Sequence, residues 1–454
     1  MSEVDLTFWL WVWVFAAAFA LVRCWREGAG AGLVLTYVLT FGVMHWLAAF
    51  LFMLPWHSEA GRDLTALGMR ESAIAMVAFA GGSEIVRFFL NRGLERGETK
   101  PASPVDGRLP TVYIAIGIFF YVFVQPVASR VPGLDAVAAT GGTLMVVAIA
   151  LKCWDGWVRQ RTGVMWAWLA GTTVLPLLTV IVQGFLGYGF AAMVTVIAFV
   201  ASFLRPRWKV VALGIVLTHI GLSVYVTYMR DRREIRAVVW SGAGVRDRVS
   251  QLGETFKSAE WFDPRKEEHL RRIDQRLNQD YLLGASVAYL EGGSVGLAHG
   301  STIMESLYAL VPRAVWANKP VVGGSGELVS IYTGLRFAEG TSVGIGQVME
   351  AYINFGRDGV IVCFLFFGAV LATLDQVAWR RLQKGNAASF LLWYLPGLSL
   401  LQIGGSFAEA TSSAAAALVI ALALRRFLTR VLPDRRAAAR DLAGDHHVDS
   451  KLSA

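Results

Sequence analysis

The sequence predicts an all-α, polytopic membrane protein with about eleven transmembrane helices and one large extracytoplasmic loop between the eighth and the ninth. Hydrophobic residues make up 55% of the 454 residues and charged residues only 17%, a balance typical of chains that cross a bilayer several times. The apolar residues also gather in blocks close to the ~20 residues that span a membrane as a helix. A helix satisfies its own backbone hydrogen bonds in lipid, so we expect one helical bundle to take up most of the chain.

Eleven apolar blocks mark the predicted transmembrane helices. Glu84 and Arg87 interrupt the third block, which makes it the weakest of the set. Glu3 and Asp5 stand where a secretory signal would carry Lys or Arg, so we expect the first block to be a membrane span and not a cleaved signal. The blocks comprise residues 8–22, 33–54, 73–90, 110–128, 137–151, 164–186, 188–204, 210–228, 360–378, 388–403 and 410–424.

The basic residues of the short loops predict the orientation of the bundle. The loops after the first, third, fifth, seventh and ninth blocks are rich in Lys and Arg, as is the C-terminal tail. The short loops on the opposite side carry only Arg62, Arg70 and Arg130. Because basic loops stay in the cytoplasm, we expect the N-terminus outside, the C-terminus in the cytoplasm and the long loop outside.

The long loop carries no net charge, and together with the apolar blocks it divides the chain into four predicted parts. It contains sixteen Lys and Arg and sixteen Asp and Glu, so the net charge of +8 lies elsewhere, which argues against a nucleic-acid partner. Cys24, Cys153 and Cys363 have no metal-ligand spacing, and we expect no zinc or other metal, no cofactor and no disulfide framework.

The four predicted parts of the chain are an N-terminal transmembrane bundle of about eight helices (1–228), the extracytoplasmic loop (229–359), about three C-terminal transmembrane helices (360–424) and a cytoplasmic tail (425–454).

An arginine-rich run opens the loop. Arg232 and Arg236 belong to residues 230–236, which continue the eighth predicted helix into the outer headgroup layer of the membrane. Two interpretations stay open. The arginines either reach lipid phosphates, as many membrane-flanking arginines do, or bind a lipid-linked pyrophosphate held at the same depth.

A charged helix is predicted further along the loop, ending at the glycines of residues 291–296. Arg272 and Arg276 lie four residues apart and therefore share one face of this helix, as a solvated surface or as a further phosphate contact. Apolar residues at spacings of three and four predict the buried stripe: Leu270, Ile273, Leu277 and Tyr281.

Two further cations stand in a rigid part of the loop. Arg313 and Lys319 lie between Pro312 and Pro320, with Trp316 between them. Two prolines restrict the backbone and an aromatic ring anchors it, so we expect the two cations to be held in place. The glycine-rich stretches that follow allow tight turns and close approach of the backbone to a ligand, although such stretches are more often only loops.

Three polar residues precede the ninth predicted helix. Glu350, Tyr352 and Asn354 alternate along the chain, as in an extended segment. The same residues equally fit a helix start, which would place Glu350 and Asn354 on one face.

This organisation resembles the oligosaccharide repeat-unit polymerases of bacterial envelope polysaccharides, the O-antigen polymerase type. The resemblance depends on the many spans with one large late loop, on residues 311–320 (VPRAVWANKP) and on residues 346–356 (GQVMEAYINFG). It implies a glycosyltransferase in the bacterial cytoplasmic (inner) membrane that takes a glycan from a polyprenyl pyrophosphate, without a nucleotide sugar. The implied partners are this lipid-linked oligosaccharide, membrane lipid, a chain-length regulator and export proteins.

Such a reaction needs cations and a base. Cleavage of the bond between sugar and pyrophosphate develops negative charge on the leaving phosphate, which Arg313 and Lys319 would stabilise with help from Arg232 or Arg236. The acceptor hydroxyl must lose its proton as it attacks, and Glu350 is the first candidate for that base.

The remaining predicted roles concern the sugar. Tyr352 and Asn354 would orient sugar hydroxyls, and Trp316 would stack on a pyranose ring. Structural alternatives stay open, because Glu350 also fits a charge at a helix start and Trp316 an anchor at the membrane interface. At the level of the whole protein, a lipid-linked glycan ligase, a transporter or flippase, and a noncatalytic subunit of an export system remain alternatives.

Overall fold

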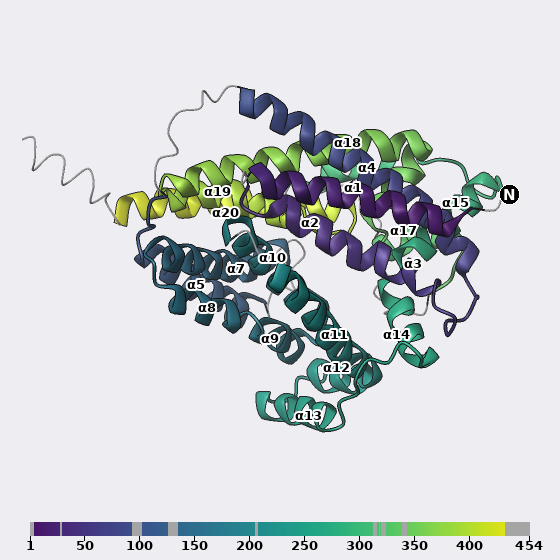
Figure 1. The fold of residues 1–454 in the computed structure, drawn as a ribbon, viewed down its shortest axis with the longest axis horizontal. Helices are drawn as coiled ribbons and strands as arrows, with labels where there is room; N and C mark the ends of the chain where they lie inside the picture. Colours follow the sequence, from purple (N-terminus) through teal and green to yellow (C-terminus); the bar gives the residue numbers. More distant parts are fainter. Residues whose placement is uncertain are drawn as a thin grey trace, which may run out of the picture.

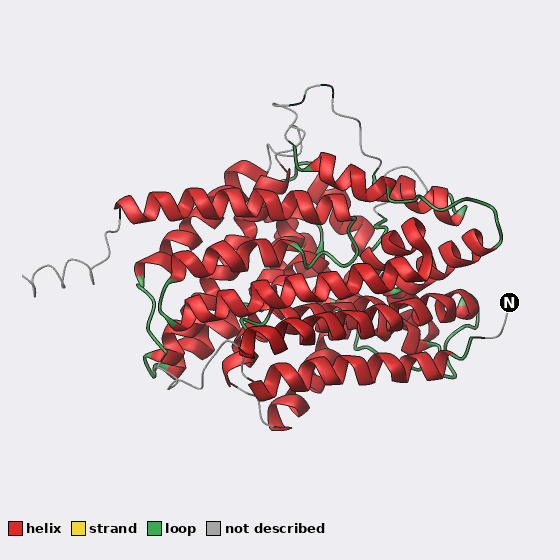
Figure 2. Cartoon of the chain, turned by 90° about the horizontal axis from the view of Figure 1, so that it is seen from above, coloured by secondary structure: helices red, strands yellow, loops and turns green. Residues whose placement is uncertain are grey.

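The structure is a computed structural model and is helical throughout the part of the chain that it describes. No strand occurs within that part (Figure 2), in agreement with the predicted all-α fold. The described residues are 4–27, 30–92, 102–125, 135–204, 208–311, 316, 318, 324–337 and 343–431.

Eight helical stretches of the described chain are long and apolar enough to cross a membrane, which is consistent with a multi-pass membrane protein. The other three predicted spans are helical as well: α5 (Arg108–Phe119) with its π-helical extension η2 (Phe120–Val124), α11 (Trp208–Arg230) and α19 (Ala387–Ser399). The eight stretches are formed by α1 (Leu6–Glu27), by α2 (Leu33–Phe41) with η1 (Gly42–Trp46) and α3 (Leu47–Leu51), by α4 (Arg62–Arg92), by α7 (Asp135–Val158), by α8 (Thr162–Gly171) with α9 (Val174–Gln183), by α10 (Leu186–Leu204), by α18 (Gln347–Gln383) and by α20 (Phe407–Val431).

Helices α1, α2, α4 and α18 run along the long axis of the molecule (Figure 1). Glycines bring the backbones of α4 and α18 into direct contact. A Cβ atom at Gly82 would lie 1.9 Å from the carbonyl oxygen of Leu365, and one at Gly368 would lie 2.2 Å from that of Phe79. Small residues allow such close packing of membrane helices, so a larger side chain at either glycine would force the two helices apart.

The charged residues of the third predicted span point into the protein. Glu84 forms an ion pair with Arg23 of α1, and Arg87 is 2% exposed and donates to the Cys24 sulfur. Because charges within a span need partners inside the bundle, these contacts explain why an interrupted apolar block still forms part of one long helix.

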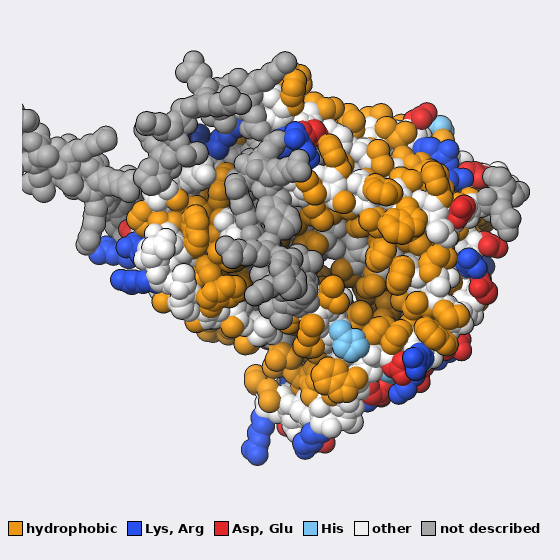
Figure 3. Space-filling view, viewed as in Figure 1, with side chains coloured by type: hydrophobic (Ala, Val, Ile, Leu, Met, Phe, Trp, Pro, Cys, Tyr) orange, Lys and Arg blue, Asp and Glu red, His pale blue; other side chains and the backbone are white. Residues whose placement is uncertain are grey.

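Lys and Arg side chains dominate one end of the molecule, whereas acidic and basic side chains mix along the opposite end and the lower edge (Figure 3). The basic end is the one that the C-terminal helix α20 approaches (Figure 1). Such an asymmetry is what the positive-inside rule associates with a cytoplasmic end.

The predicted loop is itself mostly helical. Its helices are α12 (Arg232–Trp240), α13 (Val245–Lys257), α14 (Glu267–Leu277), α15 (Gln279–Glu291), α16 (Ser301–Ala309), α17 (Ser325–Thr333) and the beginning of α18. Together with the end of α11, α12 and α13 form an arm that projects from the bundle (Figure 1).

Helix α15 packs tightly against α4 instead of projecting. A Cβ atom at Gly284 would lie 1.7 Å from the Leu64 carbonyl oxygen, and one at Gly68 would lie 2.0 Å from that of Asp280. The single charged helix predicted for this region is in fact two helices. The Asn278 side chain accepts the backbone N–H of Tyr281 at 2.9 Å and thereby starts α15. Of the predicted buried stripe, Leu270 and Ile273 are fully buried in α14.

Helix α18 contains a break. Phe355 and Gly356 have non-helical backbone angles, with φ of 64° at Gly356. The carbonyls of Ile353 and Asn354 at the break accept the backbone N–H groups of Ala298 and His299 at 2.8 and 3.2 Å. The predicted boundary between residues 359 and 360 lies shortly after this break, in the second segment of α18.

Candidate functional site

Three of the predicted substrate-binding arginines converge around the last turns of α11. Arg232 and Arg236 lie on α12, and Arg276 lies in the last turn of α14. The charges of Arg232 and Arg236 act on Arg276, and those of Arg276 and Arg232 act on the Tyr225 hydroxyl. All three arginines are half-buried. We call Arg232, Arg236 and Arg276 the arginine cluster.

The turn between α9 and α10 holds α12 in place. The carbonyl of Gly184 accepts the Tyr228 hydroxyl at 2.8 Å and Nε of Arg236 at 3.2 Å, and the carbonyl of Gln183 accepts the Trp240 indole N–H at 3.3 Å. Gly184 has a φ of 77°, which a residue with a side chain rarely adopts. A glycine turn thus positions one member of the arginine cluster.

Burial lowers the pKa of Arg276 and of Arg236, and neighbouring positive charges lower both pKa values further. Arginine remains protonated in proteins despite such shifts. Several like charges therefore act on one another in a half-buried region, and an anion bound there would offset their repulsion. Guanidinium groups bind phosphate oxygens with paired hydrogen bonds, so the cluster is suited to a phosphate or pyrophosphate.

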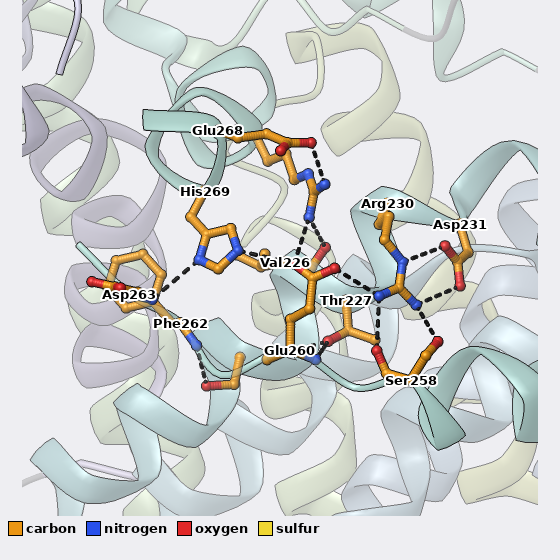
Figure 4. Close-up of polar contacts among 12 residues, drawn as sticks. Val226, Thr227, Arg230, Asp231, Ser258, Glu260, Phe262, Asp263, Glu268 and His269 are labelled. Carbon is orange, nitrogen blue, oxygen red and sulfur yellow. Dashed lines mark hydrogen bonds and ion pairs between the residues drawn. The ribbon is translucent and has the colours of Figure 1, made fainter. Parts of the chain in front are cut away.

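Arg272 has a different environment although it lies only one turn from Arg276. Its Nη1 atom lies 3.3 Å from Oε2 of Glu260, and it also forms an ion pair with Glu268. Arg230 donates to the other carboxylate oxygen of Glu260 at 2.7 Å (Figure 4). Glu260 thus lies between Arg230 and Arg272, and the structure places Arg272 in this ion-pair network instead of the arginine cluster.

His269 completes the network. The backbone N–H of Asp263 donates to Nδ1 of His269 at 3.1 Å, and Nε2 of His269 lies 2.9 Å from Oε2 of Glu260 (Figure 4). Since Nδ1 accepts, the proton of the neutral ring is on Nε2 and is donated to Glu260. The contacts fasten the link between α13 and α14, which holds α14 and its Arg276 against α11.

We expect Glu260→Gln to lower the melting temperature of the protein at neutral pH but not in strong acid. Hydrogen bonds from Arg230, with that of His269, lower the pKa of Glu260 from 4.5 to about 2. A carboxylate whose pKa is lowered by folding stabilises the folded state above its unfolded pKa, and this contribution is lost as the pH falls from about 4.5 to 2. Thermal unfolding of both proteins at pH 7 and pH 2.5 tests this. An equal difference at the two pH values would contradict it.

Glu350, the predicted base, is buried at the start of α20. It is 1% exposed, and its Oε2 atom accepts the backbone N–H of Phe407 at 2.5 Å. The Thr302 hydroxyl of α16 hydrogen-bonds to the same carboxylate. Glu350 therefore caps the N-terminus of α20, where a negative charge is favourable.

Glu409 lies beside it in the first turn of α20. Glu409 and Ser406 exchange hydrogen bonds between side chain and backbone at 3.2 Å, which is a capping box. The Ser325 hydroxyl of α17 donates to the second oxygen of Glu409 at 2.9 Å. Glu409 is exposed, whereas Glu350 is buried, and the charge of Glu409 acts on Glu350. We call Glu350 and Glu409 the carboxylate pair.

Tyr188 lies within electrostatic range of both the arginine cluster and Glu409. It lies in the first turn of α10 and is 65% exposed. The negative charge of Glu409 and the positive charge of Arg236 both act on its hydroxyl.

The other predicted residues lie around this site. The Tyr352 hydroxyl donates to Glu291 at 3.3 Å, and the buried amide of Asn354 bonds to Thr302 and to the backbone of Gly300. Asn354 thus holds α16 beside Glu350. The exposed ring of Trp316 lies 5.7 Å from that of Tyr308. Arg313 and Lys319, the two cations of the proline-bounded stretch, lie outside the described residues.

Neither Tyr188 nor Glu409 is among the site residues predicted from the sequence. Tyr188 begins an apolar block and resembles any interfacial tyrosine in the sequence. The pattern Ser-x-x-Glu at residues 406–409 is a recognisable capping box, and that signal could have located the start of α20. It would not have revealed that Glu350 meets the same turn.

Eight long apolar helical stretches in the described chain are consistent with a multi-pass helical membrane protein, and the half-buried arginine cluster is its candidate anion site. Residues 98–383 match a family described as a domain of unknown function (DUF8712). The match covers more than half of the chain, which therefore belongs to this family. The matched residues include the arginine cluster and Glu350 but end before Glu409. No curated protein and no solved structure matches the chain.

Proposed function

We propose that this protein is a membrane glycosyltransferase that polymerises polyprenyl-pyrophosphate-linked oligosaccharide repeat units into a surface polysaccharide, on the outer side of the bacterial cytoplasmic membrane. The observation that carries the proposal is the convergence of Arg232, Arg236 and Arg276 beside exposed aromatic side chains. Trp240 is 60% exposed beside Arg236, and Trp261 is 70% exposed against His219 of α11. Tryptophan prefers the headgroup layer, where the pyrophosphate of a lipid carrier also lies.

The arginine cluster would bind the pyrophosphate and stabilise the charge that develops on it as the sugar leaves. Fixed cations in a site with little water stabilise such a charge strongly, because they need no rearrangement during the reaction. The products are a glycan lengthened by one glycosidic bond and a free polyprenyl pyrophosphate. No nucleotide sugar takes part.

The carboxylate pair would supply the base. An acceptor hydroxyl can approach Glu409, which is exposed, more readily than Glu350, which is covered by α16 and α20. We therefore assign proton abstraction to Glu409 and assign Glu350, the residue favoured by the sequence, the task of positioning the first turn of α20. Both assignments are tested below by separate glutamine variants.

The direct test is incubation of purified full-length protein in lipid vesicles with the polyprenyl-pyrophosphate oligosaccharide fraction of the source cells. The proposal predicts a ladder of products that differ by one repeat unit. Transfer of a single glycan to a different acceptor would indicate a ligase, which shares the same donor chemistry. Protein that binds this fraction but leaves it unchanged would contradict a transferase.

We also expect Arg313→Ala or Lys319→Ala to abolish polymer and to leave lipid-linked single repeat units in the membrane. Removing one fixed cation from a developing phosphate charge typically lowers the rate by about 10²–10³-fold. The readout is the length distribution of the glycan on the lipid carrier in cells that express each variant at the wild-type level. Polymer of normal abundance would remove the substituted residue from the mechanism.

A transporter of lipid-linked glycan is the second candidate, and the break in α18 favours it. Discontinuous helices often form the binding sites of transporters. In this protein the carbonyls at the break are bonded to the backbone of Ala298 and His299, so the break is filled by the chain itself. A vesicle assay separates the two functions, because a transporter moves a fluorescent lipid-linked glycan across the bilayer without lengthening it.

A further inference from the structure

Three aromatic rings lie next to the arginine cluster. The rings of Phe185 and Tyr188 are 5.5 Å apart, and those of Phe185 and Trp240 are 6.2 Å apart. The guanidinium carbon of Arg236 lies 4.2 Å from the centre of the Phe185 ring and 5.3 Å from that of Trp240. Tyr188 and Trp240 are 65% and 60% exposed. We call Phe185, Tyr188 and Trp240 the aromatic platform.

We propose that the aromatic platform binds the sugar ring that is attached to the pyrophosphate of the substrate, an inference that rests on the proposed function. The first sugar is bonded directly to a phosphate oxygen. It must therefore lie no farther than the width of one sugar ring from the arginines that hold the phosphate. Arg236 belongs to the arginine cluster and also stacks on Phe185, which places the platform at that distance. Aromatic rings offer a flat apolar surface with a polar edge, which fits the C–H face and hydroxyl rim of a pyranose.

The charges around Tyr188 distinguish a substrate site from an aromatic belt that faces lipid. An interfacial ring in contact with lipid would have hydrocarbon on one side and headgroups on the other. Tyr188 instead packs on Phe185, against whose ring the Arg236 guanidinium lies at 4.2 Å, and the charges of Arg236 and Glu409 both act on its hydroxyl. A sugar on this platform would have the leaving phosphate at its Arg236 edge.

Protection of a cysteine placed on the platform tests this inference without relying on turnover. Cys24, Cys153 and Cys363 are replaced by Ala, Tyr188→Cys is introduced, and a charged, water-soluble thiol reagent is applied to full-length protein in vesicles. Modification should be at least about tenfold slower in the presence of the extracted polyprenyl-pyrophosphate oligosaccharide fraction, and unchanged by polyprenyl pyrophosphate alone. Trp240→Cys repeats the measurement at the other edge of the platform.

Each outcome bears on one proposal or the other. Protection by the glycan-bearing lipid supports the platform even if the wild-type protein forms no ladder, in which case only the polymerase function fails. A ladder from the wild type without protection at either cysteine overturns the platform and leaves the function standing. Equal protection by the bare carrier, or reaction only with a lipid-soluble reagent, also overturns it, because the rings then face phosphate or lipid.

Kinetics provide a second readout if the wild type is active. Tyr188→Leu should raise the KM for the lipid-linked substrate by about tenfold with a smaller effect on kcat, because the lost contact is made by the ring in the bound ground state. Tyr188→Phe keeps the ring and should retain a KM near that of the wild type. A KM that rises equally in both variants would assign the effect to the hydroxyl and overturn the stacking role.

Discussion

Arg232→Ala should lower the rate of polymer formation by about 10²–10³-fold without destabilising the protein. Arg232 acts on Arg236 and on Arg276 as a like charge, so its removal relieves repulsion within the arginine cluster. A residue retained only for folding would show the opposite pattern, with lower stability and a proportionate loss of activity. The rate is measured from ladder formation and the stability from thermal unfolding in the same vesicles or detergent.

Arg233→Ala is the matched control. Arg233 is the next residue on α12 and is exposed, whereas Arg232 is half-buried. The control should polymerise at the wild-type rate, since a general effect of positive charge on lipid binding would affect both residues alike. Similar losses in the two variants would indicate attraction to the membrane surface instead of a defined phosphate site. Arg232→Lys should fall between wild type and Arg232→Ala, because an ammonium group keeps the charge but loses the paired hydrogen bonds.

Glu409→Gln should lower the rate by about 10²–10⁴-fold, the usual contribution of a positioned base. The glutamine oxygen can still accept the backbone N–H of Ser406, and its amide N–H₂ can donate to the Ser325 hydroxyl oxygen, so the capping box of α20 should remain. The loss would therefore come from the missing proton acceptor. The rate at which the first glycosidic bond forms, in single turnover and at several pH values, measures the effect.

Glu350→Gln separates the two members of the carboxylate pair. A glutamine oxygen can still accept the backbone N–H of Phe407, so we expect a far smaller loss than for Glu409→Gln. Glu327→Gln, which changes an exposed carboxylate on α17, serves as the control for charge alone. The reverse order, with Glu350→Gln the more damaging variant, would show that the buried carboxylate is the base.

The membrane-spanning part of the fold could be predicted from the sequence because it depends on composition over long windows. A block of apolar residues must form a helix in lipid whatever its neighbours are, and even the block interrupted by Glu84 and Arg87 is helical. The positions of the helices and turns within the loop were harder to predict from the sequence. The break at Asn278 depends on one side-chain hydrogen bond, and the same heptad-like spacing fits one helix or two.

The sequence predicted the types of residue in the candidate site, but it could not predict which of them lie close together in the structure. Arg232, Arg236 and Arg276 come from two parts of the loop that the sequence offered as separate candidate phosphate contacts, and the structure places both parts against α11. Arg272 lies four residues before Arg276, as Arg232 lies four residues before Arg236, but it forms an ion pair with Glu260. Glu260 lies in a link without regular structure, so the periodicity of the sequence could not predict its position. The contact of Glu350 with the start of α20 depends on packing between distant segments, and so does the place of Tyr188.

The most direct test of the account is the side of the membrane on which the arginine cluster lies. A single cysteine is introduced as Arg233→Cys, after Cys24, Cys153 and Cys363 have been replaced by Ala, and a membrane-impermeant maleimide is applied to right-side-out and inside-out vesicles. Labelling is expected in right-side-out vesicles, where the carrier pyrophosphate is presented for polymerisation. Labelling confined to inside-out vesicles would place the cluster in the cytoplasm and contradict the proposed function.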